Sequence, residues 1–375
     1  MSPPPSRAAV RRSHRASLPV PASVLDPGPF PGYARPAMTQ VQISRFGGAD
    51  VLVPVEVSSP PLAPGQVRIK VSAAGVNFAE VQMRMGLYPE APKVPFVPGF
   101  EVAGVVVETA PGVRDFRRGE RVLAVCRFGG YASEVVLPAS QVRKTPRRLS
   151  DKEAAAVPVS FLTAWIALVD LARVREGDRV LIPGAAGGVG TAMVQVAARA
   201  GARVTAVVGT ADKKEKVRAL GAAQALTYDE LQSGRGGNGH DFTVILEPRG
   251  GRHVKESMRR LAPCGRVICY GVSSLVNGPT RSIPRVVGQL LGTPFFTPIG
   301  LQMGNRGIMG LNLLKFFDSE EGLKLAMQAM DSALAGLQSG MFTPVVGKTF
   351  PLSKAGEAHK YLQSRKAVGK VVLLG

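Results

Sequence analysis

The chain has 375 residues, of which 45% are hydrophobic and 20% charged, a composition typical of a folded protein of two domains. Its 47 lysines and arginines against 27 acids give a net charge of +20, which attracts the phosphates of small molecules, anionic lipids or nucleic acids. We expect no nucleic-acid partner, because the sequence has neither zinc-finger spacing nor basic stretches interleaved with aromatics. Its three scattered cysteines exclude a disulfide framework and indicate a reducing, cytoplasmic compartment: Cys126, Cys264 and Cys269.

The first 37 residues are rich in proline and arginine and carry no periodic apolar pattern. We therefore expect a disordered basic extension over 1–37. Arg11 and Arg12 resemble the basic part of a targeting peptide, but the prolines from Pro19 onward exclude an apolar signal core and a stable amphipathic helix. We expect Met38 to be the natural start of the chain.

Short apolar runs separated by glycine and proline follow, and they predict a mostly β first domain. The expected strands are Val41–Arg45, Val67–Ala73, Val102–Val107, Arg121–Ala124 and Ala132–Val136. Asp151–Ala172 then carries apolar residues at helical spacing, which predicts a helix at the end of this domain.

A short apolar strand at 180–183 runs into a glycine-rich turn and then into an alanine-rich helix. The turn reads A-x-G-x-x-G from Ala185 to Gly190, and its glycines allow backbone N–H groups to approach a pyrophosphate at the start of the helix. A second strand, Arg203–Val208, follows at βαβ spacing, so we predict a dinucleotide-binding domain rather than an ordinary glycine-rich turn. The residues expected to cradle the dinucleotide are Ala186, Gly187, Gly188, Val189 and Gly190.

The end of the second strand lacks the acidic residue that would bind the ribose 2′-hydroxyl of NADH. Thr210, Lys213 and Lys214 stand there instead, and a hydroxyl with two ammonium groups favours the 2′-phosphate of NADPH. A second interpretation places the two lysines on a solvated helix face. Asp212 is either the N-cap of a helix that starts near Lys213 or a ribose ligand.

The rest of the sequence predicts strands near Val244 and Val267, an edge strand at Gly307–Leu311 and a helix at Glu320–Leu337. The tail predicts a turn, a helix and a final strand, and it is too short to fold alone. We therefore expect three parts: the extension 1–37, a first domain at 38–160 that is completed by 316–375, and a nucleotide-binding domain at 161–315.

One uncharged run, Val286–Asn305, is long enough to raise the question of a membrane span, which needs about 20 predominantly apolar residues. The run contains prolines, glycines, amides and hydroxyls, which argue against a span. We interpret Thr293–Ile299 within it as an apolar loop that covers a substrate or lies against a surface.

Several motifs lie in order along the chain: Asn77–Glu80, Arg84–Pro89, Pro95–Gly104, Ala154–Pro158, Phe161–Trp165, Gly184–Gly190 and Val368–Val371. Together they resemble the zinc-free quinone oxidoreductase (zeta-crystallin-like) branch of the medium-chain dehydrogenase/reductase superfamily, over nearly everything from Met38 onward. Tyr270–Thr280 and Ile308–Asn312 look closest to the vesicle amine transport protein homologues of that branch. The resemblance implies an α/β fold, with a GroES-like, mostly β catalytic domain and a Rossmann NADPH-binding domain built on a doubly wound parallel sheet.

The resemblance also implies that no metal is bound. Zinc-dependent members place a cysteine where Asn77 stands and a histidine where Phe100 stands, and Val159 and Ser160 lie near the expected third ligand without offering a thiolate. The four histidines have no ligand spacing, and we expect each of them at the surface: His14, His240, His253 and His359.

The resemblance further implies a site in which NADPH gives a hydride to a small-molecule quinone or enone. Asn77 and Tyr88 match positions that line the nicotinamide pocket, and we expect both to donate hydrogen bonds to the oxygen that becomes negative. Asn77 is alternatively a residue that holds its turn, and Tyr88 a rim aromatic. Gln82 replaces a further family tyrosine, which leaves the arrangement of donors open. Three more residues match cofactor-binding positions: Thr163, which is alternatively a hydroxyl of the helix wall, Tyr228 and Gly271.

Three functions follow from this reading. An NADPH-dependent quinone or enone reductase is favoured, and its nearest rival is an enoyl-thioester reductase, which must protonate an α-carbon. The third is a membrane-surface or lipid-handling protein with weak or no catalysis, which would use the net charge and the apolar 286–299 region against an anionic membrane. We also expect a homodimer, because the resemblance places Gly307–Leu311 at a domain edge that pairs with its twin.

Overall fold

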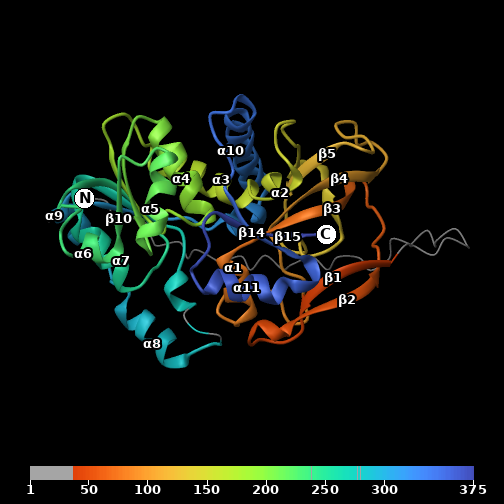
Figure 1. The fold of residues 1–375 in the computed structure, drawn as a ribbon, viewed down its shortest axis with the longest axis horizontal. Coiled ribbons are helices and arrows are strands. Elements are labelled where there is room, and N and C mark those ends of the chain that lie inside the picture. Colours follow the sequence, from red (N-terminus) through yellow and green to blue (C-terminus); the bar gives the residue numbers. More distant parts are fainter. Residues whose placement is uncertain (1–36, 238, 277, 279) are drawn as a thin grey trace, which may run out of the picture. The chain divides into compact units, whose positions relative to one another are not determined.

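The computed structural model describes residues 37–237, 239–276, 278 and 280–375 (Figure 1). The disorder and the start site expected for 1–37 thus lie outside the described residues, except that Ala37 is the first residue of strand β1.

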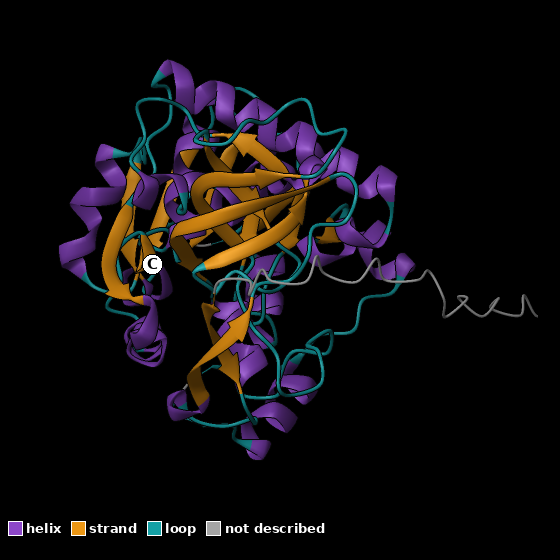
Figure 2. Ribbon diagram, turned by 90° about the vertical axis from the view of Figure 1, so that its right-hand side faces the viewer, coloured by secondary structure: helices purple, strands orange, loops and turns teal. Residues whose placement is uncertain are grey.

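The first half of the molecule, built from the N-terminal part of the described chain and from its C-terminal tail, contains a mostly antiparallel sheet. Its strand order is β14-β15-β3-β4-β5-β7, and β6 also pairs with β3. Figure 2 looks onto this half and shows its strands curving around one another. Its strands are β3 (Gln66–Val76), β4 (Glu101–Thr109), β5 (Arg121–Val125), β6 (Glu134–Pro138), β7 (Val142–Lys144), β14 (Val346–Pro351) and β15 (Lys370–Leu374). The tail therefore contributes two strands to this sheet, and β15 pairs antiparallel with β3.

A separate two-stranded sheet pairs β1 (Ala37–Ile43) with β2 (Leu52–Ser58). The sequence did not predict β2, because Pro54 interrupts its apolar pattern; an edge strand tolerates a proline that a central strand does not. β7 was missed as well, since it has only 3 residues.

The helix predicted at Asp151–Ala172 is divided. Pro158 lies in the first turn of α3 and ends the preceding α2, as a proline that cannot donate its backbone nitrogen requires. The helical run Asp151–Leu171 is long and apolar enough to cross a membrane, but 72% of its most apolar window is buried inside the fold, as in a core helix. The helical segments of this half are η1 (Ala49–Val51), α1 (Phe78–Arg84), η2 (Ala139–Gln141), α2 (Asp151–Ala154), α3 (Pro158–Trp165), the π-helical η3 (Ile166–Leu171), η7 (Leu352–Lys354) and α11 (Ala355–Gln363).

The second half contains a six-stranded, entirely parallel sheet with the order β10-β9-β8-β11-β12-β13. Its strands are β8 (Arg179–Pro183), β9 (Arg203–Val208), β10 (Gln224–Thr227), β11 (Phe242–Glu247), β12 (Leu261–Cys269) and β13 (Gly307–Gly310). The strand order reverses between β8 and β11, and ligands of such sheets bind in the crevice at the carboxyl ends of these two strands. The predicted fold class, a mostly β domain with a doubly wound parallel sheet, is confirmed.

Helices cover both faces of the parallel sheet (Figure 1). Apolar residues of α3, α4, α5 and α10 form one core on one face, and those of α6 and α7 pack on the other. The helical segments are α4 (Gly188–Arg199), η4 (Ala211–Lys213), α5 (Lys214–Ala219), α6 (Tyr228–Gln232), α7 (Arg252–Arg259), η5 (Ser273–Leu275), α8 (Ile283–Gly292), α9 (Pro298–Gly304), η6 (Leu313–Asp318) and α10 (Glu320–Ser339).

The interpretation of Thr293–Ile299 as a loop is correct only for its first part. α8 ends at Gly292 and α9 begins at Pro298, so the uncharged run forms two short helices around a brief connection. Pro284 and Pro298 each lie in the first turn of a helix, where proline is favoured rather than disruptive.

Candidate functional site

The glycine-rich turn joins β8 to α4 at the carboxyl edge of the parallel sheet. Gly184 has a φ of +71°, which favours glycine, and a Cβ on Gly190 would lie 2.4 Å from the carbonyl oxygen of Gly184. Gly187, the N-cap of α4, offers no side-chain hydrogen bond to the first turn of this 12-residue helix. The first backbone N–H groups of α4 are therefore available to an anion such as a pyrophosphate.

Thr210 and Lys213 follow the end of β9, but their surroundings differ. Thr210 is exposed. Lys213 is buried, and its Nζ donates to the carbonyl oxygens of Arg365 at 2.7 Å and Ala367 at 3.3 Å. Burial lowers the pKa of this lysine. The alternative that places Lys213 on a solvated helix face is therefore wrong.

The structure also shows the surroundings of Asp212 and Lys214, on either side of Lys213. Thr210 is the N-cap of η4 and Lys213 that of α5, so the interpretation of Asp212 as an N-cap is wrong, and its exposed carboxylate remains open to a ribose. Lys214 pairs with Glu230 at 2.5 Å between Nζ and Oε2.

Tyr228 begins α6 directly after β10. Thr227 pairs with Val208 in the register of β10 and β9, so Tyr228 lies beside the end of β9. Its hydroxyl is 3.9 Å from the position of a Cβ on Gly184, the first glycine of the turn. Burial raises the pKa of Tyr228, so its hydroxyl stays protonated and able to donate. The structure thus brings Tyr228 to the cradle.

A network of buried polar side chains lies behind the cradle. Lys370 donates from Nζ to Asn77 Oδ1 at 2.6 Å and forms an ion pair with Glu101. Asn77 Nδ2 donates to Glu101 Oε1 at 3.0 Å and to Glu80 Oε1 at 3.2 Å. Asn77 and Glu80 also form a capping box at the start of α1. Both amide hydrogens of Asn77 are thus used inside the protein, and its side chain holds the turn.

Lys370 joins this network to the nucleotide cradle. A Cβ on Gly188 would lie 3.0 Å from Lys370 Cδ and 3.3 Å from Ser160 Oγ, which is buried without a hydrogen-bond partner among the described residues. The preceding Gly369 donates from its backbone nitrogen to the carbonyl oxygen of Ala186 at 2.7 Å. The start of β15 therefore fastens the β half of the molecule to the turn that would hold a dinucleotide.

The network continues to His359, for which the sequence predicts a surface position. That placement is wrong: His359 is fully buried, because α11 turns it towards the core of the first half. Tyr131 donates to Glu80 Oε2 at 2.7 Å, so His359 Nε2, 3.0 Å from the same hydroxyl, acts as the donor to Tyr131. Burial lowers the pKa of His359 to about 3, which keeps the ring neutral.

Tyr88 and Gln82 differ in how firmly they are held. Gln82 is buried and donates from Nε2 to the carbonyl oxygen of Val272 at 3.2 Å, next to Gly271. The Tyr88 hydroxyl makes no hydrogen bond to any described residue. Burial, with a smaller contribution from Glu90, raises the pKa of Tyr88 to about 12. Tyr88 is therefore a half-buried hydroxyl that stays protonated and is free to donate.

Thr163 and Gly271 both stand against backbone. Thr163 is buried and donates from Oγ1 to the carbonyl oxygen of Val159 at 2.6 Å, the contact expected of a helix-wall hydroxyl. A Cβ on Gly271 would lie 2.8 Å from the carbonyl oxygen of Pro248, so the chain passes closely there and tolerates only glycine.

Three residues around the site were missed in the sequence. Arg249 is the second residue after β11, and its place at the carboxyl edge of the sheet is a signal that the strand pattern offered. Lys370 and Arg365 lie in the tail, far along the chain from the residues that they contact. Lys370 stands in the motif Val368–Val371, but no local pattern gave it a contact or a role, and Arg365 had no signal at all.

A zinc ion would find poor ligands in this site. Asn77 offers an amide oxygen that already accepts from Lys370, and the side chain of Phe100 offers no ligand atom. The carboxylate oxygens of Glu80 and Glu101 already accept hydrogen bonds from N–H and O–H groups, and Glu101 is also paired with the ammonium of Lys370. Among the described residues no group of three or more histidine, cysteine or acidic side chains is placed to hold a metal.

The buried carboxylate of Glu80 predicts a pH dependence of stability. Burial raises the pKa of Glu80 from 4.5 to about 7. A raised pKa in the folded state stabilises the protein below pH 4.5, and this contribution is lost as the pH rises to about 7, by about 3 kcal/mol at 1.36 kcal/mol per pKa unit. His359 has the opposite sign, because its pKa is lowered. Urea unfolding at pH 5 and at pH 7.5 gives the change in the free energy of unfolding between these two pH values. We expect this change to lack the contribution of Glu80 in the variant Glu80→Gln. The same change in the wild type and in the variant would contradict the raised pKa of Glu80.

The chain is similar to proteins of known sequence and structure over most of its length. Two family models match: the alcohol dehydrogenase GroES-like domain at 63–147 and the zinc-binding dehydrogenase domain at 220–373. The synaptic vesicle membrane protein VAT-1 homolog of Rattus norvegicus is 33% identical over 351 residues, which cover 90% of this chain and 84% of the relative. The 2-haloacrylate reductase of a Burkholderia species is 35% identical over 345 residues, 88% of this chain and 97% of the relative. The quinone oxidoreductase of Thermus thermophilus, solved also in complex with NADPH, matches with a TM-score of 0.72 and 32% identity over 90% of this chain and 100% of that one.

Proposed function

This chain belongs to the medium-chain dehydrogenase/reductase superfamily, in its quinone oxidoreductase branch, and from that premise we propose a zinc-independent, NADPH-dependent oxidoreductase that reduces a quinone or an α,β-unsaturated carbonyl. The observation that carries the proposal is the uncapped start of α4 behind a glycine-rich turn, beside a site whose residues are poor zinc ligands. The likeness to a 2-haloacrylate reductase and to a quinone oxidoreductase supports this class of acceptor.

The bound cofactor would supply a hydride, and the chain's own residues would place the acceptor and stabilise its charge. When a quinone or enone accepts a hydride, its carbonyl oxygen becomes negative, and a fixed O–H donor stabilises that oxygen. We assign this role to Tyr88, whose hydroxyl is free and protonated. Asn77 and Gln82 would shape the pocket from behind, because their amides are engaged within the protein.

The proposal is tested by following NADPH oxidation in metal-free buffer with a panel of quinones, enones, 2-haloacrylates and enoyl thioesters. We expect turnover with a quinone or an enone that is insensitive to a chelator. Activity that is lost with the chelator and restored by zinc would overturn the zinc-independent reading. A preference for the thioester would favour the enoyl-thioester reductase instead.

The choice of cofactor follows from the ends of β9 and β10. Thr210, Lys213 and Tyr228 would surround the 2′-phosphate of NADPH with two hydroxyls and an ammonium group. Lys213 would exchange the carbonyl oxygens that it now contacts for the phosphate, whose charge makes it the stronger acceptor.

Replacing Lys213 with glutamate inverts the charge at this point. Charge-assisted contacts contribute about 1.5–3 kcal/mol, and repulsion adds to their loss, so NADPH binding should weaken by at least about tenfold while NADH binding changes little. Fluorescence titration of both cofactors checks this, with the exposed Lys366→Glu as the control. Equal binding of both cofactors by the wild type would contradict the assignment and return Asp212 to the ribose.

A surface of α8 and α9 supports a second candidate function, contact with an anionic membrane. Large apolar side chains are exposed on it, with Leu291 84% and Phe295 91% accessible. The sequence has no acidic residue between Glu256 and Asp318, so the segment that carries this surface contributes only neutral and basic side chains. Apolar side chains with a basic surround suit anionic lipid headgroups. We call this surface the α8–α9 patch: Ile283, Val287, Leu290, Leu291, Phe295, Ile299 and Met303.

The patch is tested with the double variant Leu291→Asp/Phe295→Asp. We expect the wild type to sediment with phosphatidylserine vesicles at low salt and the variant to remain in solution. Leu325→Asp, which places an aspartate at an exposed leucine of α10 outside the patch, should behave as the wild type. If the wild type does not bind the vesicles, but light scattering shows a dimer that the double variant does not form, then a second copy of the chain covers the patch, in addition to any pairing of the edge strand β13.

A further inference from the structure

Arg249 lies beside Tyr228 at the carboxyl edge of the parallel sheet. Tyr228 follows β10 and Arg249 follows β11, and these strands are separated in the sheet by β9 and β8. Even so, the guanidinium carbon of Arg249 lies 5.2 Å from the centre of the Tyr228 ring. The tyrosine therefore reaches across the carboxyl ends of the two middle strands, and Arg249 covers its ring.

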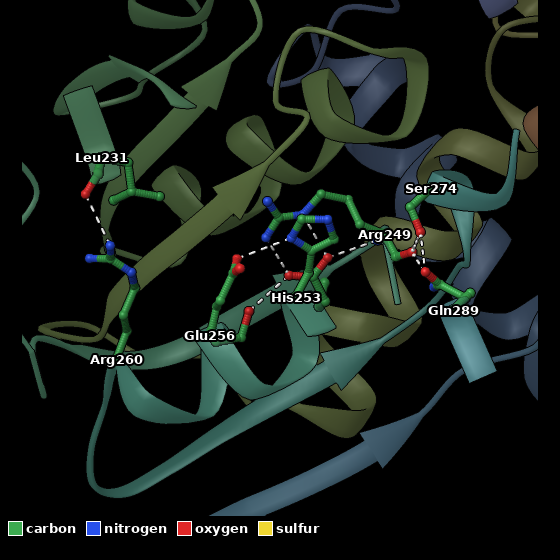
Figure 3. A network of polar contacts seen from close by, with 9 residues as sticks. Leu231, Arg249, His253, Glu256, Arg260, Ser274 and Gln289 are labelled. Carbon is green, nitrogen blue, oxygen red and sulfur yellow. Dashed lines mark hydrogen bonds and ion pairs between the residues drawn. The ribbon is translucent and has the colours of Figure 1, made fainter. Parts of the chain in front are cut away.

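Arg249 is held in place from both ends. Its Nε and Nη2 donate to the fully buried carboxylate of Glu247 at 2.9 and 2.7 Å. Its carbonyl oxygen accepts from Ser274 Oγ at 2.6 Å and from Gln289 Nε2 at 3.2 Å. Figure 3 shows Ser274 and Gln289 at the backbone of Arg249, with the guanidinium reaching away from them. Little side-chain entropy remains to be lost when a ligand binds.

One edge of the guanidinium is still free. Nη1 has no partner among the described residues, and Arg249 lines a cavity of about 240 Å³ together with Tyr228, Glu256, Ser257 and Arg260. The Glu256 carboxylate is 3.0 Å from Nδ1 of His253. Arg260 is already engaged, since it donates to the carbonyl oxygens of Leu231 and Gly237. Arg249 therefore offers unused N–H donors next to the tyrosine that touches the cradle.

We propose that Arg249 is a specificity-determining residue for the cofactor: its free Nη1 edge binds the phosphate on the adenosine ribose, beside Tyr228, and so favours NADPH over NADH. The inference rests on the proposed function, because it assumes that an adenine dinucleotide occupies the cradle. Lys213 approaches the same ribose from the end of β9, whereas Arg249 approaches from the end of β11. Glu247 and Glu256 reduce the net charge at this point, so Arg249 acts through directed hydrogen bonds more than through long-range attraction.

The experiment measures binding to the full chain by calorimetry with two probes, adenosine 2′,5′-bisphosphate and adenosine 5′-monophosphate. They differ only in the 2′-phosphate. We expect Arg249→Met to weaken binding of the bisphosphate by about tenfold or more and binding of the monophosphate by less than about twofold. Arg259→Met, which removes the same charge from an exposed position on α7, should leave both affinities unchanged.

Arg249→Met leaves Glu247 with the Ser257 hydroxyl and a backbone N–H as donors. The double variant Glu247→Gln/Arg249→Met removes both charges together and provides the same comparison if the single variant does not fold. A preference for the bisphosphate that survives in these variants overturns the role of Arg249 alone. Failure of the wild type to bind either probe overturns the proposed function, and this inference with it.

Discussion

Replacement of Tyr88 with phenylalanine is expected to slow turnover of the best quinone or enone acceptor by about 10- to 100-fold, the effect typical of removing one donor to a developing oxyanion. Tyr88 is half-buried, and its hydroxyl has no partner among the described residues, so the substitution removes a donor without breaking a contact inside the protein. The loss should fall on kcat, with KM changing by less, because the negative charge on the acceptor develops only in the transition state.

The pKa of Tyr88 sharpens this test. Since burial raises the pKa to about 12, the hydroxyl keeps its proton at every pH at which the enzyme is assayed. The ratio of wild-type to variant kcat should therefore stay constant from pH 6 to pH 9. Tyr361→Phe makes the same chemical change on α11, where the ring packs against Phe350, and should leave kcat unchanged. An unaltered kcat in Tyr88→Phe would make Tyr88 a packing residue at the rim.

The fold class was predictable from the sequence because the patterns that indicate it are local. The apolar run, the glycines and the alanine-rich helix of 180–199 are contiguous, and each constrains the conformation of its neighbours. Strand β2 is not evident in the sequence because Pro54 stands inside it. The helices α8 and α9 are not evident because Pro284 and Pro298 stand in their first turns, where proline favours a helix start but also resembles a break. In each case a proline alone does not show where it lies within a strand or helix.

The site was less predictable because its decisive contacts join distant parts of the chain. Lys213 is 152 residues from Arg365, whose carbonyl oxygen it contacts, and Asn77 is 293 residues from Lys370. The sequence at the end of β9 predicted the residue types around the adenosine ribose. No local pattern shows that Lys213 is buried against the tail, or that both amide hydrogens of Asn77 are bonded within the protein. The same reason hides His359, which takes its burial from the packing of α11.

Replacement of Lys370 with methionine is expected to lower the free energy of unfolding by about 3–5 kcal/mol, the usual cost of removing one partner of a buried ion pair. The side chains of Lys370 and Glu101 are 4% and 0% exposed, so the carboxylate would be left without its cation in a place that water does not reach. Asn77 would lose the donor to its amide oxygen at the same time.

Urea unfolding of Lys370→Met measures this loss, with Lys366→Met, an exposed lysine of the same segment, as the control. The double variant Lys370→Met/Glu101→Gln removes both charges and should recover a large part of the lost stability, because the cost lies in the unpaired carboxylate rather than in the missing attraction. The backbone contact of Gly369 with Ala186 remains in all three variants. Dinucleotide affinity should therefore recover together with stability in the double variant, whereas an affinity that stays low while stability recovers would mean that the ammonium of Lys370 itself faces the cofactor.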